Sequence, residues 1–356
     1  IGDGGDIIIK AGSTLATDKA YITAVTFGQG NGGNIIIKAN TVSLTNGTYV
    51  DSFTGGIGNA GNIEINSKDN FVITGSRISS SAIFKDSGDA GDISIVSDGS
   101  IFIHGNTRIG NSNFFSGNAG NIDLNAKDSI SIVNSRIFSN SFDTNKSGSG
   151  FAGTITIKAG NSFALSSESE ITSATLSEAQ ESESGSRWGT ILIDAGSVSL
   201  SDRAILSTTA YGVVAGGDIG IQTQTLSLTD GSRITAESVG SGKAGNIIVN
   251  AAKSVTLSGF APLEFEREWP FFGGMSSGLF ANTETLNSGA GGNIEVNTGN
   301  LQITNGAVIS ARTQSSDPGG NISVNVDNLN ITEGGQIIAT ALSSGNAGNI
   351  TVIAKD

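Results

Sequence analysis

The amino-acid sequence predicts an all-β protein, a right-handed parallel β-helix (solenoid) of about 12 coils with three short strands in each coil. Three observations predict this fold: a repeat of about 28 residues anchored on glycine, apolar positions that alternate with polar ones inside each repeat, and a composition rich in glycine. The 356 residues include 51 Gly, only 3 Pro and no Cys. We therefore expect a single solenoid domain over residues 1–356.

The repeat begins at a glycine that precedes Asn, Asp or Thr. Six of the eleven spacings between successive anchors equal 28 residues, and the others are longer. The hexapeptide GNAGNI contains this anchor and occurs at 58–63, 117–122 and 345–350. Because a stacked unit tolerates added loop residues better than deletions, we expect insertions at about 138–152, 174–188 and 258–278. The anchors are Gly5, Gly33, Gly61, Gly91, Gly120, Gly153, Gly189, Gly217, Gly245, Gly292, Gly320 and Gly348.

The first predicted strand of each coil follows its anchor directly. Two residues after the anchor stands Ile in all twelve repeats, and two residues further stands Ile, Leu or Val. The residue between them is usually polar, as at Glu64, Ser94 and Thr156. A period of two with β-branched residues is typical of a strand with one buried face.

Two further strands complete each coil. A second apolar pair, such as Val42 and Leu44, begins about nine residues after the anchor, and a turn such as Thr-Asn-Gly at 45–47 follows it. A third apolar column then runs from Ile22 to Ile337, with a small residue two positions later. A β-propeller has a similar period but uses about four antiparallel strands per blade, so three strands favour a coil.

The repeated corner has a mechanical interpretation. We expect its glycines to take positive φ angles and to pass close to neighbouring coils. We expect the Asn before each first strand to stack on its counterparts in a hydrogen-bonded ladder, with Asp6, Asp92 and Asp218 as acceptors in the same column. Calcium-binding β-rolls instead carry dense Asp at a nine-residue period, so we interpret the column as structural.

Composition argues against several functions. A net charge of −13 disfavours nucleic acids and anionic membranes as partners. The absence of Cys excludes disulfides and thiolate metal sites, and no apolar run approaches the roughly 18 residues of a transmembrane segment. The sequence has one histidine, His104, and no Cys, so it lacks the residues for a His/Cys metal cluster and argues against a Ser-His-Asp triad. We therefore expect no catalytic residue, no metal and no cofactor, and we do not expect an enzyme.

Taken together, the repeats resemble a known family. Units of the form GNAGNI-x-I/V, L-x-L-T-N-G and I-x-A-x-T resemble filamentous-haemagglutinin-type exoproteins of two-partner secretion systems, particularly the large cyanobacterial ones, and SGLFANTETLNSGAGGNIEV at 277–296 is similar to their repeats. The resemblance implies an adhesin at the surface of a Gram-negative bacterium or outside it, exported through an outer-membrane pore partner. Neither end looks capped, so we expect a piece of a longer rod.

We therefore predict a structural or adhesive segment of a secreted or cell-surface exoprotein. One alternative is a β-helix that binds or cleaves carbohydrate, and another is a filament that self-assembles end to end. Two groups of residues are candidates for contact with a glycan or a cell-surface receptor. They are Trp269, Phe271 and Phe272 in the aromatic loop 257–279, and Arg77, Arg108 and Arg136 in one column before the third strand. The alternative for the first group is a loop that folds back on the helix, and the alternative for the second is a solvated face.

Overall fold

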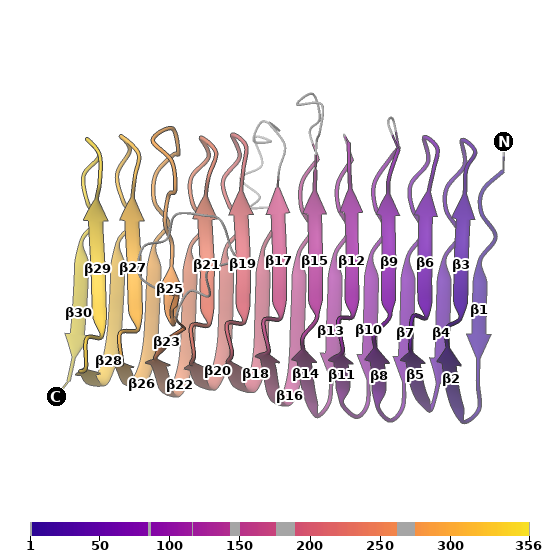
Figure 1. The fold of residues 1–356 in the computed structure, drawn as a ribbon, viewed down its shortest axis with the longest axis horizontal. Helices are drawn as coiled ribbons and strands as arrows, with labels where there is room; N and C mark the ends of the chain where they lie inside the picture. Colours follow the sequence, from indigo (N-terminus) through magenta and orange to yellow (C-terminus); the bar gives the residue numbers. More distant parts are fainter. Residues whose placement is uncertain are drawn as a thin grey trace.

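The computed structural model describes residues 2–84, 87–115, 117–142, 150–175, 189–261 and 275–355, and it confirms the all-β parallel β-helix. Eleven complete turns stack along one axis, and β30 (Ile350–Ala354) begins a twelfth (Figure 1). The central residues of the three predicted insertions, 143–149, 176–188 and 262–274, lie outside the described part. The first of these insertions begins later than predicted, because the third strand of its turn continues to Ser141.

Two long parallel sheets form the walls of the rod. Sheet A has 17 strands. Sheet B has 11 strands, and each complete turn contributes one of them. The strands of sheet A are β1 (Ile7–Lys10), β2 (Thr14–Asp18), β4 (Ile35–Ala39), β5 (Thr41–Thr45), β7 (Ile63–Ser67), β8 (Phe71–Thr74), β10 (Ile93–Ser97), β11 (Ile101–His104), β13 (Ile122–Ala126), β14 (Ser129–Val133), β16 (Ile155–Ser166), β18 (Ile191–Leu200), β20 (Ile219–Leu228), β22 (Ile247–Ser258), β26 (Ile294–Thr304), β28 (Ile322–Ile331) and β30. The strands of sheet B are β3 (Tyr21–Thr26), β6 (Tyr49–Thr54), β9 (Arg77–Ala82), β12 (Arg108–Asn113), β15 (Arg136–Ser141), β17 (Glu170–Thr175), β19 (Ile205–Ala210), β21 (Arg233–Ser238), β25 (Gly278–Phe280), β27 (Val308–Thr313) and β29 (Gln336–Ala341).

The prediction of three strands per coil holds for turns 1 to 5 and is wrong for turns 6 to 11. In the later turns the first two strands merge into one strand of 10 to 12 residues, such as β16 and β18. In turns 3 to 5 the pairs Lys68-Asp69, Asp98-Gly99 and Lys127-Asp128 lie between the first and second strands, where the sheet bends. We call this bend of sheet A, between the first and second segments of each turn, the A corner.

The inward-facing columns stack in register. Ile63 pairs with Ile35 before it and Ile93 after it, and the same register continues along sheet A. These side chains are fully buried and belong to one core cluster that extends through the rod. Burial of one such side chain stabilises the fold by about 1.5–3 kcal/mol. One turn cannot enclose its own apolar face, so stacking supplies the core.

The glycines at the corner before each first strand are explained by close approach. A Cβ atom on Gly61 would lie 2.2 Å from the carbonyl oxygen of Gly33. The prediction of positive φ is wrong for the anchors other than Gly189, which has a φ of 78°. Positive φ occurs instead in the turn before the third strand, at Asn46 (53°) and Gly47 (85°). At nine of the twelve anchors a Cβ atom would meet the carbonyl oxygen of the preceding anchor, so these positions require glycine because successive backbones touch.

The predicted asparagine ladder is confirmed. The Oδ1 atom of Asn34 accepts a hydrogen bond from the backbone N–H of Asn62 at 2.9 Å, and Oδ1 of Asn62 accepts one from Asp92 at 2.8 Å. The first Asn of GNAGNI forms a second ladder, in which Oδ1 of Asn31 accepts from the N–H of Asn59 at 2.9 Å. These bonds join a side chain to a backbone, so an aspartate serves as well as an asparagine.

The small residues of the third strand make a hydrogen-bonded bridge across the core. The Ser80 hydroxyl is fully buried, donates to the carbonyl oxygen of Gly61 at 2.7 Å and accepts from the N–H of Gly91 at 3.0 Å. Ser80→Ala leaves both backbone groups unpaired, so we expect the free energy of unfolding to fall by about 2 kcal/mol in urea denaturation. Ser79→Ala, on the outer face of the same strand, is the control and should change it by less than about 0.5 kcal/mol. Equal effects of the two substitutions would contradict this role of the hydroxyl.

Candidate functional site

The three arginines predicted to form a column do so on the outer face of sheet B. Arg108 on β12 pairs in register with Arg77 on β9 and with Arg136 on β15, and all three side chains are exposed. Neighbouring strands of a sheet lie about 4.8 Å apart, so the backbone positions that carry the three guanidinium groups are closely spaced. The structure therefore brings these candidates together.

Acidic neighbours neutralise two of the three arginines. Arg77 donates from Nε to Oδ1 of the buried Asp51 at 3.1 Å, and this hydrogen bond raises the pKa of the Arg77 guanidinium. Nε of Arg136 lies 3.6 Å from Oε2 of Glu170. Only Arg108 has no ion pair with a described residue. The column is consequently a weaker anion site than three free arginines would be.

Aromatic side chains surround the arginine column. Tyr21 and Tyr49 stack with ring centroids 5.1 Å apart, and the Arg77 guanidinium lies 4.7 Å from the centroid of the Tyr49 ring. A hollow of about 330 Å³ lies between Arg108 and Arg136 and is lined by Phe114, Phe138 and Phe142, among others. This face therefore combines planar side chains with one unpaired cation.

The aromatic candidates of the loop lie outside the described residues. These are Trp269, Phe271 and Phe272. The described base of the loop is a pair of short antiparallel strands, β23 (Phe260–Ala261) and β24 (Met275–Ser276). Phe260 at this base is 57% exposed.

The structure also shows the surroundings of the single histidine. His104 ends β11, in register with Thr74 and Val133, and its Nε2 lies 3.3 Å from the Ser131 hydroxyl. In the described ranges, no three His, Cys, Asp or Glu side chains gather closely enough to hold a metal ion.

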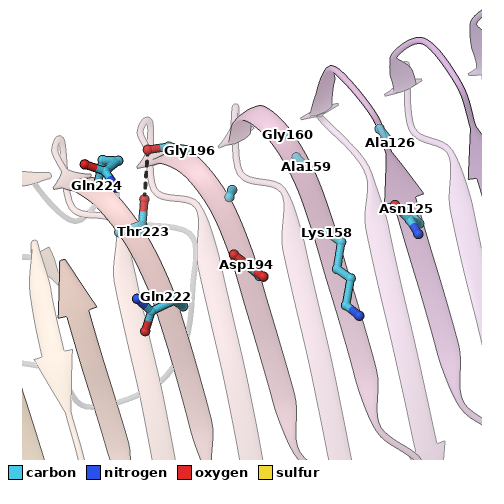
Figure 2. A pocket seen from close by; sticks show the side chains of 11 residues that line it. Asn125, Ala126, Lys158, Ala159, Gly160, Asp194, Gly196, Gln222, Thr223 and Gln224 are labelled. Atoms are coloured by element: carbon cyan, nitrogen blue, oxygen red, sulfur yellow. Dashed lines mark hydrogen bonds between the residues drawn. The ribbon is translucent and has the colours of Figure 1, made fainter. Parts of the chain in front are cut away.

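A groove along the A corner is the site that the sequence analysis missed. Its wall in turns 5 to 8 carries one polar residue per turn, and Figure 2 shows these side chains on successive strands. They are Asn125, Lys158, Asp194 and Gln222, and they are register partners. The volume of this stretch is about 500 Å³.

The A corner is also hollowed over turns 1 to 4. A second stretch of about 440 Å³ is lined by Lys10, Lys38, Asn66 and Lys68, among others. The two stretches meet where Val96 of turn 4 pairs with Asn125 of turn 5. The recurrence of Lys, Asn, Asp or Gln three residues after the first Ile was visible in the sequence, but only the bend at the A corner makes this row one wall of a groove.

A second charged cluster lies on the outer face of sheet B in turns 8 to 10. The Arg233 guanidinium stacks 3.9 Å from the centroid of the Phe280 ring, and Nη2 of Arg312 donates to both carboxylate oxygens of Glu284 at 2.9 and 2.8 Å. Burial raises the pKa of Glu237 to about 7, and the nearby Glu284 acts in the same direction, while Arg233 and Arg312 oppose the rise.

The described part of the chain contains no helix that could span a membrane. Protein-family models, curated protein sequences and solved structures each gave no match to this chain.

Proposed function

We propose that the chain is a structural and adhesive segment of a secreted or cell-surface exoprotein, in which a stiff rod holds binding surfaces away from a cell. The observation that supports this most is the stacking of eleven turns in register around one core. At about 4.8 Å per turn the rod is roughly 50 Å long. A surface that repeats along such a rod suits contact with an extended partner.

The location proposed for this rod is the surface of a Gram-negative bacterium or the medium around it. The support is the resemblance of its repeats to filamentous-haemagglutinin-type exoproteins, which also implies an outer-membrane pore partner. The absence of Cys is consistent with export of an unfolded chain through a narrow pore, because no disulfide loop can block it. Turns that contact only their neighbours can fold one after another as they emerge.

The arrangement of carboxylates favours binding over cleavage in the groove of the A corner. Glycosidases place two carboxyl groups about 5–9.5 Å apart across the scissile bond. The described acidic residues that line the groove, Asp98 and Asp194, belong to turns 4 and 7. Three turns separate them, about 14 Å along the axis.

Three measurements on the purified chain test this proposal. We expect small-angle X-ray scattering to show an extended particle, and we expect no new reducing or unsaturated ends after incubation with acidic and neutral polysaccharides. Beads coated with the chain should be retained on a surface that carries a polysaccharide. Release of new ends would contradict the structural and adhesive role and support the carbohydrate-cleaving alternative.

A further inference from the structure

Two adjoining hollows at the A corner, one over turns 1 to 4 and one over turns 5 to 8, together form the groove. One wall is a row of outward side chains that are register partners from turn 1 to turn 8. The row consists of Lys10, Lys38, Asn66, Val96, Asn125, Lys158, Asp194 and Gln222. Its rungs lie about 4.8 Å apart, so eight rungs extend over roughly 34 Å. A site of this form suits a linear ligand that repeats along its own length.

Small residues lie at the floor of the groove. Ala39, Ser67, Ala126, Ala159 and Ala195 follow the wall residues in successive order along the rod and line the two stretches. These residues are buried and face the core, so they form the floor of the groove through their backbone rather than through side chains that a ligand could contact.

The described lining of the groove carries four lysines against Asp98 and Asp194, a modest positive excess on a chain whose net charge is −13. Lys10, Lys68 and Lys158 line it and have no ion pair with a described residue, whereas Lys38 lies 3.0 Å from Glu64. In turns 5 to 8, Asp194 is the only acidic residue that lines the groove within the described part. Cations at intervals along the row match anionic groups at intervals along a polymer.

The other side chains of the groove indicate a hydroxyl-rich partner. Asn40, Asn66, Asn125, Gln222 and Gln224 supply amide donors and acceptors. The described residues that line the groove include no aromatic side chain. Single-stranded nucleic acid is usually bound by aromatic stacking in strongly basic grooves, so the lining disfavours nucleic acid, while its amides suit hydroxyl groups.

We propose that the groove of the A corner binds a linear acidic polysaccharide along the rod axis, with Lys10, Lys68 and Lys158 contacting its carboxylates. This inference deepens the proposed adhesive function and rests on it, because it assigns the glycan contact to sheet A. The arginine column of sheet B, which is largely neutralised, is then not the main glycan site.

Isothermal titration calorimetry with an oligogalacturonate, a linear polymer with one carboxylate per ring, tests the ligand class. The matched probe is its methyl ester, which has the same chain without the charges. We expect the acid to bind, the ester to bind at least about fivefold more weakly, and the difference to shrink as salt rises. Equal binding of acid and ester, or tighter binding of oligothymidylate, would overturn the acidic-polysaccharide proposal.

Charge variants test the position of the site. The triple variant Lys10→Gln, Lys68→Gln, Lys158→Gln changes exposed residues only and should weaken binding about tenfold. The control Arg108→Gln, Arg136→Gln, Lys243→Gln makes the same change in net charge elsewhere and should bind like the wild type. If the control variant loses more affinity for oligogalacturonate than the triple lysine variant, the ligand binds outside the groove, and the proposal is overturned.

Asp194→Asn provides a test that a folding defect cannot imitate. It removes a negative charge from the groove wall, so oligogalacturonate should bind about twofold more tightly. Unchanged or weaker binding in this variant would contradict a ligand that passes Asp194. If no oligogalacturonate binds at all, the groove proposal fails, while the extended shape and the absence of turnover still test the proposed function separately.

Discussion

Replacing Gly61 with alanine is expected to lower the free energy of unfolding by about 3 kcal/mol. The added Cβ would lie 2.2 Å from the carbonyl oxygen and 2.5 Å from the carbonyl carbon of Gly33 in the preceding turn. Both atoms belong to a backbone that the stacked sheets hold in place, so relief requires the turns to separate. Separation would also lengthen the hydrogen bond from the Gly61 N–H to the Ser52 hydroxyl, which is 3.0 Å long.

Guanidinium denaturation followed by circular dichroism measures this effect. Gly12→Ala is the matched control, because a Cβ there would have no atom within 4 Å and its φ is not in the left-handed region. This control should be neutral or slightly stabilising, by up to about 1 kcal/mol, since alanine restricts the unfolded chain. If Gly61→Ala changes the free energy of unfolding as little as Gly12→Ala does, the turns move apart easily and the anchor glycines have another role.

Glu237 is expected to make the stability of the rod depend on pH between about 4.5 and 7. Burial raises the pKa of Glu237 to about 7 from the ordinary value of 4.5. The folded protein therefore holds this proton more tightly than the unfolded chain. The resulting stabilisation is complete below pH 4.5 and is lost as pH rises through 7, and its size is about 3 kcal/mol at 1.36 kcal/mol per pKa unit.

Glu237→Gln isolates this contribution from those of the other carboxylates. We expect wild type and variant to have similar unfolding free energies at pH 5, and the variant to be more stable at pH 8 by up to about 3 kcal/mol. The groups that face Glu237 are Arg233, Glu284, Arg312 and Tyr211. The pKa of the Tyr211 hydroxyl is raised chiefly by burial and then by Glu237. If the two proteins show parallel pH profiles in guanidinium denaturation, the carboxylate is solvated and the assigned burial is wrong.

The repeat was sufficient to predict the fold and most of its internal contacts. The Ile column at Ile35, Ile63 and Ile93 stacks in register because its period in the sequence equals one turn of the coil. The ladder through Asn62 follows for the same reason, since equal spacing places equal side chains above one another. Such local, periodic features need no knowledge of distant parts of the chain.

Features that depend on how segments approach each other could not be predicted. The sequence placed Arg77 and Arg136 in one column, but not the acidic partners Asp51 and Glu170 beside them. Asp51 precedes Arg77 by 26 residues, and its position next to the guanidinium depends on which face of the strand turns outward. The same holds for Glu237 and Glu284, which become neighbours only after residues between them form a further turn.

The sequence by itself determined the β-helix, its period and the stacked core, because a strict repeat of apolar and small residues admits one way of burying every apolar face. Only the tertiary structure decided why the anchors are glycine, where the strands merge, and where a ligand can lie. Most anchor glycines face the carbonyl oxygen of the preceding anchor, as Gly61 faces that of Gly33. The groove arises where sheet A bends at the A corner in eight successive turns, and a bend shared by neighbouring turns is a property of their packing, not of any one repeat.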